Sequence, residues 1–82
     1  MNYTIEWASS AVKDLERLPL DVQKRVIVKL DSIVENPFRF LEHFEGEYYK
    51  LRIGEYRALI DLDFDNKKII IQVLDKRGRI YK

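Results

Sequence analysis

The two prolines, Pro19 and Pro37, do most to limit how this chain can fold. A proline lacks the N–H that an α-helix needs and drives the preceding residue out of the helical region. Pro19 therefore separates two helices and Pro37 ends the second, with Ser9 or Ser10 as the expected cap of the first and Asp21 at the start of the next. Apolar residues recur at helical spacing on both sides of Pro19: Ala8, Ala11, Val12, Leu15 and Leu18, then Val22, Val26, Leu30, Ile33 and Val34. The sequence predicts a helical hairpin with a very short turn.

Strand-like alternation flanks this hairpin. Tyr3, Ile5 and Trp7 alternate with polar residues before it. After it we expect a loop over residues 38–47 and then three strands, joined by a turn at Gly54-Glu55 and a turn at residues 63–66. The run from Lys68 to Leu74 is rich in β-branched residues, as expected for a central strand. The predicted order is β-α-α-β-β-β, an α+β fold in which the helical hairpin packs on one face of a small, mainly antiparallel sheet.

The length and composition exclude several classes of protein. Eighty-two residues predict a single domain over residues 1–82. The chain has no cysteine and one histidine, His43, so we expect no disulfide, no thiolate site and no metal site. A Ser-His-Asp arrangement would have to use His43, which we expect to be an ordinary loop residue. No run of 18 apolar residues and no signal peptide is recognisable, which predicts a cytoplasmic protein with no membrane contact.

The near-neutral net charge of +1 hides an asymmetry between the two halves of the chain. Residues 48–82 hold nine of the fifteen Lys and Arg but five of the fourteen acids. Such a basic half suggests an anionic partner that docks at one place, although a solubilising charged surface would look the same.

Three cations are expected to gather on two adjacent strands. Lys50 and Arg52 lie on one face of a strand, about 7 Å apart, and Arg57 follows the turn at Gly54-Glu55 and can share that face. The alternative is that each cation pairs with a nearby acid (Asp61, Asp63 or Asp75) or reaches solvent from an edge strand. A cluster facing solvent would suit a polyanion, because packed cations repel one another.

Such a cluster has a definite use in an enzyme that acts on RNA. The ribose 2′-hydroxyl can attack its own phosphate when a base removes its proton, donors neutralise the phosphorane and an acid protonates the leaving oxygen. Without a credible metal or histidine, positioning and charge would carry most of the acceleration. Arginine suits the phosphate, since it stays protonated and binds bidentately.

The segment Tyr49–Arg57 (YKLRIGEYR) and the ending Asp75–Tyr81 (DKRGRIY) resemble the RelE/ParE toxin superfamily, and RelE in particular. The opening strand, the A-x-x-D-L-x-x-L-P helix over residues 11–19 and the second helix before Asn36-Pro37 also fit. The resemblance covers essentially the whole chain. It implies a RelE-like fold and a toxin of a type II toxin–antitoxin system, which cleaves mRNA in the ribosomal A site.

The resemblance also implies a role for individual residues. Lys50 takes the place of the candidate general base, and Arg52 stands where RelE proteins often have lysine, which favours phosphate stabilisation. Arg57 corresponds to a phosphate clamp, Arg77 to the proton donor or leaving-group stabiliser, and Tyr81 to the tyrosine that stacks on or orients the substrate nucleotide. Further RNA contacts are expected from the remaining C-terminal cations: Lys76, Arg79 and Lys82.

The implied partners are mRNA, the ribosome and a RelB-like antitoxin, which would form a hetero-oligomer with this chain. The implied enzyme is a metal-independent endoribonuclease with no cofactor. Two alternatives stay open on the same fold. One is a ParE-type toxin that poisons DNA gyrase, and the other is a non-catalytic relative that binds RNA or protein.

Overall fold

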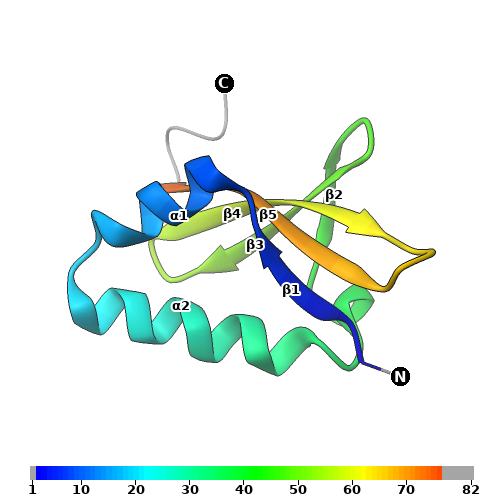
Figure 1. Cartoon of the computed structure of the whole chain (residues 1–82), viewed down its shortest axis with the longest axis horizontal. Coiled ribbons are helices and arrows are strands. Elements are labelled where there is room, and N and C mark those ends of the chain that lie inside the picture. The colour runs from blue at the N-terminus through cyan, green and yellow to red at the C-terminus, as the bar shows by residue number, and fades with distance from the viewer. Residues whose placement is uncertain (1, 77–82) are drawn as a thin grey trace.

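The computed structural model describes residues 2–76, which form two helices and a five-stranded sheet (Figure 1). The elements along the chain are β1 (Thr4–Trp7), α1 (Ser9–Glu16), α2 (Leu20–Ile33), the 3₁₀ turn η1 (Pro37–Arg39), β2 (Glu42–Glu45), β3 (Tyr48–Ile53), β4 (Tyr56–Asp63) and β5 (Lys68–Lys76). Neither described helix combines the length and the apolar character that crossing a bilayer requires.

The strands lie side by side in the order β1-β5-β4-β3-β2. β1 pairs with β5 in parallel, and the other three pairings are antiparallel. The predicted α+β fold with a mainly antiparallel sheet is therefore confirmed. β5 is an interior strand, as its β-branched run indicates, although β4 occupies the middle of the sheet.

The prediction of a loop over residues 38–47 is wrong, because this segment contains η1 and β2. β2 is a short, mostly exposed edge strand with charged residues, which gives it little strand propensity. It pairs with β3 through a two-residue turn, Gly46-Glu47. The same pair of residue types, Gly54-Glu55, joins β3 to β4. Both glycines have a positive φ, +59° at Gly46 and +60° at Gly54, as tight hairpin turns require.

The predicted turn between β4 and β5 is confirmed and is held by Asp63. Its carboxylate accepts hydrogen bonds from the side chain of Asn66, at 2.9 Å, and from the Asn66 backbone N–H, at 3.1 Å. These bonds, the side-chain bond first, lower the pKa of Asp63. The next residue, Lys67, has a φ of 56°, which is uncommon outside glycine.

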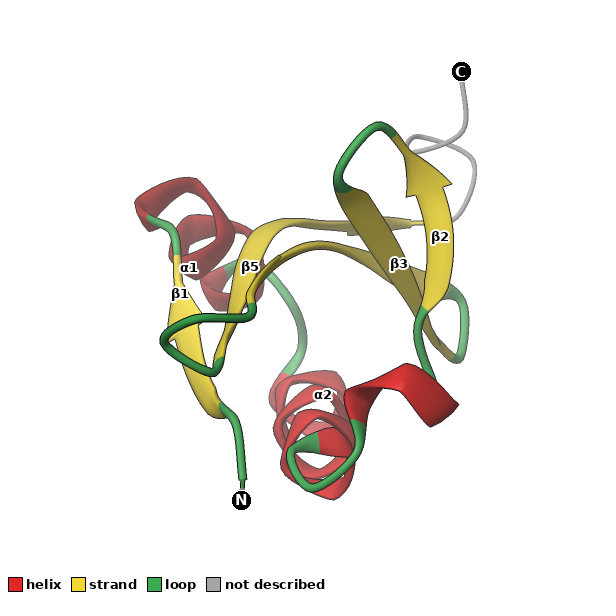
Figure 2. Ribbon diagram, turned by 90° about the vertical axis from the view of Figure 1, so that its right-hand side faces the viewer, coloured by secondary structure: helices red, strands yellow, loops and turns green. Residues whose placement is uncertain are grey.

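The core lies between the concave face of the sheet and α2, which crosses beneath it (Figure 2). The apolar stripe of α2 supplies Val26, Leu30 and Ile33, which are almost completely buried. The sheet supplies the inward residues of β3, β4 and β5: Leu51, Ile53, Ala58, Ile60, Leu62, Ile69, Ile71 and Leu74. In β3 and β4 the inward residues alternate with the predicted cations, so the alternation read from the sequence holds in these two strands.

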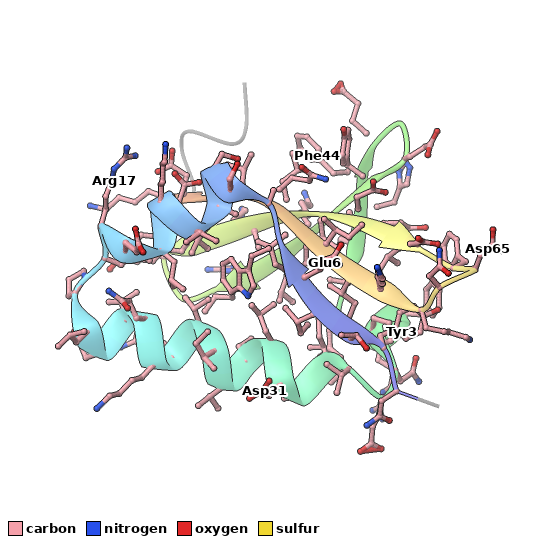
Figure 3. All side chains as sticks on the ribbon, in the orientation of Figure 1. Tyr3, Glu6, Arg17, Asp31, Phe44 and Asp65 are labelled. Carbon is pink, nitrogen blue, oxygen red and sulfur yellow. The ribbon has the colours of Figure 1, made fainter. Side chains whose placement is uncertain are left out.

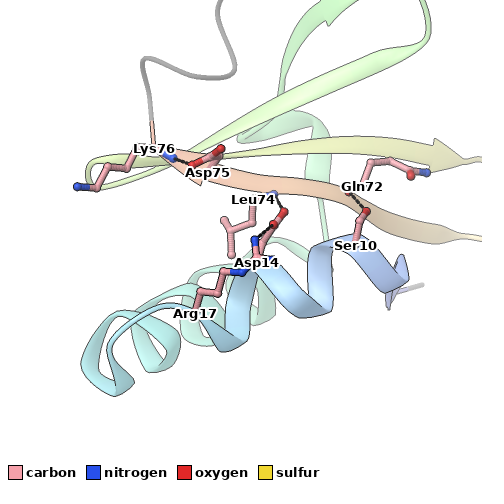
Figure 4. Close-up of polar contacts among 7 residues, drawn as sticks. All are labelled: Ser10, Asp14, Arg17, Gln72, Leu74, Asp75 and Lys76. Atoms are coloured by element: carbon pink, nitrogen blue, oxygen red, sulfur yellow. Dashed lines mark hydrogen bonds and ion pairs between the residues drawn. The ribbon is translucent and has the colours of Figure 1, made fainter.

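α1 continues along the edge of β5 beyond the point where β1 ends (Figure 4). Ser10 Oγ donates to the carbonyl of Gln72 at 3.0 Å, and the Asp14 carboxylate accepts the Leu74 N–H at 3.0 Å. These contacts satisfy backbone groups of β5 that have no partner strand there. The expected serine cap is wrong, since Ala8 occupies the cap position without a side-chain hydrogen bond.

A β-bulge in β5 reverses the alternation of its last residues. Leu59 pairs with Val73 and Ile60 with Ile71, so Gln72 is the extra residue. Simple alternation from Ile71 would place Asp75 on the side of α2. The bulge turns Asp75 to the opposite face, as bulges commonly do when they redirect a side chain.

We expect Gly54→Ala to lower the free energy of unfolding by about 1 kcal/mol. A left-handed conformation costs a residue with a Cβ about 1–2 kcal/mol, partly offset by the lower chain entropy of alanine when unfolded. Chemical denaturation measures this change. Gly46→Ala is the matched control: its φ is nearly the same, but an added Cβ meets nothing within 4 Å, whereas at Gly54 it lies 3.4 Å from Arg25 Nη1. A much larger loss at Gly54 would show that the contact, not the backbone, dominates.

Candidate functional site

The face of the sheet turned away from α2, here called the outer face, carries the predicted cations. In β3 and β4 it consists of alternate residues: Tyr48, Lys50 and Arg52, then Arg57, Leu59 and Asp61. Arg52 and Arg57 are direct cross-strand partners, and Lys50 faces Leu59 one step further along. Their common face follows from the two-residue turn at Gly54-Glu55, which fixes the register of the hairpin.

Arg57 is the cation that is most enclosed. It is 6% exposed, and among residues 2–76 no other charged side chain is buried. It has Arg52 as its neighbour in β3 and Asp75 as its neighbour in β5. A buried charge requires compensation, and two like charges in direct register repel each other. The carboxylate of Asp75, brought there by the bulge, lies where it can supply that compensation.

Lys50 lies in β3, on the side of the outer face that borders β2. It is partly buried, and its direct partner in β2 is Glu42. Its Nζ lies 5.7 Å from the centre of the Phe44 ring, within the range of a cation–π contact. Figure 3 shows Phe44 on the side of the sheet opposite α2. The cations of this face thus border an aromatic ring, a combination that suits nucleic acid.

Lys76 does not join this group. It pairs with Tyr56 and therefore lies on the other face from Arg57, because the bulge shifts the end of β5. There it helps to line a hollow between the end of α1 and the sheet, with Arg17, Pro19 and Tyr56. The other predicted C-terminal residues, which are Arg77, Arg79, Tyr81 and Lys82, lie outside the described residues.

His43 lies in β2 and not in a loop, but its role is structural. Its Nε2 lies 2.7 Å from the carbonyl oxygen of Gly46, and its ring meets Tyr49 edge-on. Both contacts hold the β2–β3 hairpin together. Among residues 2–76, no three His, Cys, Asp or Glu side chains are grouped so that they could hold a metal ion.

Sequence reasoning missed two residues of the outer face. Phe44 was hidden because its strand was expected to be a loop. Asp61 was considered as a partner for a cation, not as part of a binding surface, although alternation from Arg57 places it on that face. The repeated Gly-Glu-Tyr at residues 46–48 and 54–56 is the signal that could have revealed the β2–β3 hairpin.

Comparisons with known proteins point to toxins of the RelE and ParE groups. Residues 5–81 match the family model described as the ParE toxin of a type II toxin–antitoxin system. Over its whole length the chain is 27% identical to Toxin RelG of Mycobacterium tuberculosis, of which it covers 99%. It is similar to a chain in the archaeal RelE–RelB complex of Pyrococcus horikoshii (28% identity, TM-score 0.78, 96% of this chain and 99% of that chain). The fold also resembles a chain of the M. tuberculosis RelBE2 complex (23% identity, TM-score 0.85, 94% and 100% covered).

We expect Asp75→Asn to lower the free energy of unfolding by about 1–2 kcal/mol, because it leaves the buried Arg57 and its neighbour Arg52 without the facing carboxylate. The asparagine oxygen can still accept the Lys76 N–H, which Asp75 binds at 2.7 Å, so the loss isolates the charge. Added salt should change this loss little, because buried charges are weakly screened. Asp65→Asn, in the exposed β4–β5 turn, is the control, and equal losses in the two variants would contradict this role of Asp75.

Proposed function

The chain belongs to the ParE toxin family of type II toxin–antitoxin systems, within the RelE/ParE superfamily, and from this premise we propose that it is a ribosome-dependent endoribonuclease that cleaves mRNA in the A site. The observation that carries the proposal is the shared outer face of Lys50, Arg52 and Arg57. A toxin that binds protein alone has no evident need for three cations on one sheet face. A phosphate undergoing attack does, because its charge grows in the transition state.

In the proposed reaction the 2′-oxygen attacks the adjacent phosphorus, and the bond from phosphorus to the 5′-oxygen breaks. Lys50 takes the proton from the 2′-hydroxyl, and its Nζ, 5.7 Å from the centre of the Phe44 ring, lies at the border of the outer face. Arg52, which is exposed, contacts the non-bridging phosphate oxygens. Arg57 binds the phosphate from the floor of the outer face, and the packing around its side chain holds the guanidinium in place.

The remaining roles belong to the C-terminal residues. Arg77 donates a proton to the leaving 5′-oxygen or stabilises its charge, and Tyr81 stacks on or orients the nucleotide. Arg79 and Lys82 contact RNA phosphates. Lys76 is assigned to the same RNA surface by sequence, but its place on the other face makes it the weakest member of this set. The reaction needs no metal and no cofactor.

A RelB-like antitoxin is the proposed protein partner, by analogy with the archaeal RelE–RelB complex. The outward side of α2 supports a helical or extended acidic partner. Leu20 and Val28 are 73% and 68% exposed there, and the cations around them would attract acidic residues: Lys24, Arg25 and Lys29. Exposed apolar groups of this kind commonly mark a protein interface.

A gyrase-inhibiting toxin is the second candidate, because the matching family model carries the name ParE. A non-catalytic binding relative is the third. The shared face of Lys50, Arg52 and Arg57 favours an RNA-directed toxin over a gyrase inhibitor. Cleavage of RNA separates the ribonuclease from a relative that only binds it. Gyrase supercoiling assays with the purified chain separate the second candidate from the first.

The purified chain should cleave mRNA on programmed ribosomes, and the products should carry 2′,3′-cyclic phosphate and 5′-hydroxyl ends. These ends follow from attack by the 2′-oxygen. Cleavage should survive chelation of any metal bound to the toxin, provided that the ribosomes keep their magnesium. Primer extension and end-specific ligation identify the ends. Products with 3′-hydroxyl and 5′-phosphate ends would exclude the mechanism, and inhibition of gyrase without cleavage would support the ParE-type alternative.

Arg77→Ala should lower the single-turnover cleavage rate by about 10²-fold or more, the usual scale for losing an acid or a charge-stabilising group. Affinity for the ribosome should fall less, since other cations still contact phosphate. Lys76→Ala is the matched control, because it removes the same charge from the neighbouring position on the face opposite Arg57. Parallel losses of rate and binding in both variants would mean that Arg77 serves only as an electrostatic contact.

A further inference from the structure

A hollow lies on the outer face, at the end of β3 and β4 remote from the Gly54-Glu55 turn. Its volume is about 290 Å³, and its walls are Gly46, Glu47, Tyr48 and Asp61. The first two form the β2–β3 turn, and the last two are direct partners across β3 and β4. Tyr48 precedes Lys50 by two residues, so the hollow begins about 7 Å from the cations of the proposed active site.

Two side chains of the sheet line the hollow, and both have groups available to bind a ligand. Tyr48 is 41% exposed, which is high for an aromatic residue within a strand. Asp61 is partly buried on the middle strand, yet its carboxylate makes no hydrogen bond or ion pair with any other residue among 2–76. A partly buried carboxylate normally has such a partner. Its neighbour in β5, Ile70, cannot supply one.

We propose that this hollow binds a nucleobase of the cleaved RNA, stacked on Tyr48 and donating an amino N–H to the Asp61 carboxylate. The inference rests on the proposed ribonuclease function and adds a base-binding subsite to it. Single-stranded RNA is commonly read in this way, by aromatic stacking and by hydrogen bonds to the exposed base edge. A phosphate is excluded from the hollow by the negative charges of Asp61 and Glu47. The phosphates of the RNA backbone bind instead to the neighbouring cations, Lys50, Arg52 and Arg57.

The chemistry of the carboxylate predicts which bases fit. Adenine, cytosine and guanine each carry an exocyclic amino group that can donate to Asp61. Uracil has no amino group. The donor on its Watson–Crick edge is the N3–H, and the carbonyl oxygens on either side of it would approach the carboxylate with like partial charge. The subsite should therefore discriminate against uracil at one position of the A-site codon, and the ratio of rates should be on the order of tenfold, as for one good base contact.

The test uses ribosomes programmed with matched mRNAs that carry each of the four bases at each A-site codon position. The wild-type chain should cleave the amino-bearing bases about tenfold faster than uracil at one position. Asp61→Asn should bring that ratio close to one, because an amide can donate to a uracil carbonyl as well as accept from an amino group. Tyr48→Leu should slow cleavage of all four, since every base can stack. Asp65→Asn, away from the hollow, should keep the wild-type ratio.

A second measurement separates the failure of this inference from the failure of the proposed function. Titration of the free chain with AMP, CMP, GMP and UMP, followed through the Tyr48 ring resonances by NMR, needs no ribosome and no cleavage. The first three should shift these resonances at lower concentration than UMP does. Cleavage in which Asp61→Asn keeps the full preference against uracil would overturn the subsite and leave the ribonuclease intact. Selective nucleotide binding without cleavage would do the reverse, and equal or absent shifts with all four nucleotides would overturn the subsite.

Discussion

The register of the β3–β4 hairpin is the constraint on which the rest of this structure depends. The two-residue turn at Gly54-Glu55 fixes it, and Gly54 makes that turn possible through its positive φ. One register places the apolar residues of both strands against α2 and brings Arg52 next to Arg57. A slip of one residue would turn the cations toward the core and the apolar residues toward solvent. Burial of the core therefore fixes the geometry of the outer face, and the proposed site needs no separate folding device.

The burial of Arg57 shows how local irregularities complete this face. Regular alternation along β5 would bring an apolar residue, Leu74, to the outer face beside Arg57. The bulge at Gln72 exchanges it for Asp75, and α1 stabilises the same stretch of β5 through Asp14, whose carboxylate accepts the Leu74 N–H. The stability of α1 on the sheet edge and the charge balance of the outer face are thereby linked. A change in either should affect the other.

The sequence predicts much of this fold, because the periodicities of its main elements are strong. The two helices, β1 and the strands β3 to β5 are confirmed, and alternation places the inward faces of β3 and β4 in the observed core. β2 was missed because its residues are mostly charged. It is stabilised by pairing with β3, and local strand propensity does not reflect such pairing. Ser10 was misread as a helix cap for a similar reason, since its hydroxyl binds Gln72, 62 residues away. The formation of β2 and the role of Ser10 both depend on contacts between segments that local sequence pattern does not reveal.

The candidate site also has a part that local sequence pattern predicts and a part that it does not. Alternation within one strand, together with a recognisable turn, is enough to place Lys50, Arg52 and Arg57 on one face. The compensation by Asp75 and the exclusion of Lys76 depend on a bulge that the sequence does not mark. The outer face also has a polarity along β3 and β4, with cations near the Gly54-Glu55 turn and carboxylates, Glu47 and Asp61, at the far end. An RNA strand lying across it would meet attraction for its phosphates at one end and repulsion at the other, so that this end favours an uncharged base. Charge alone can thus set the direction in which the proposed RNA substrate lies.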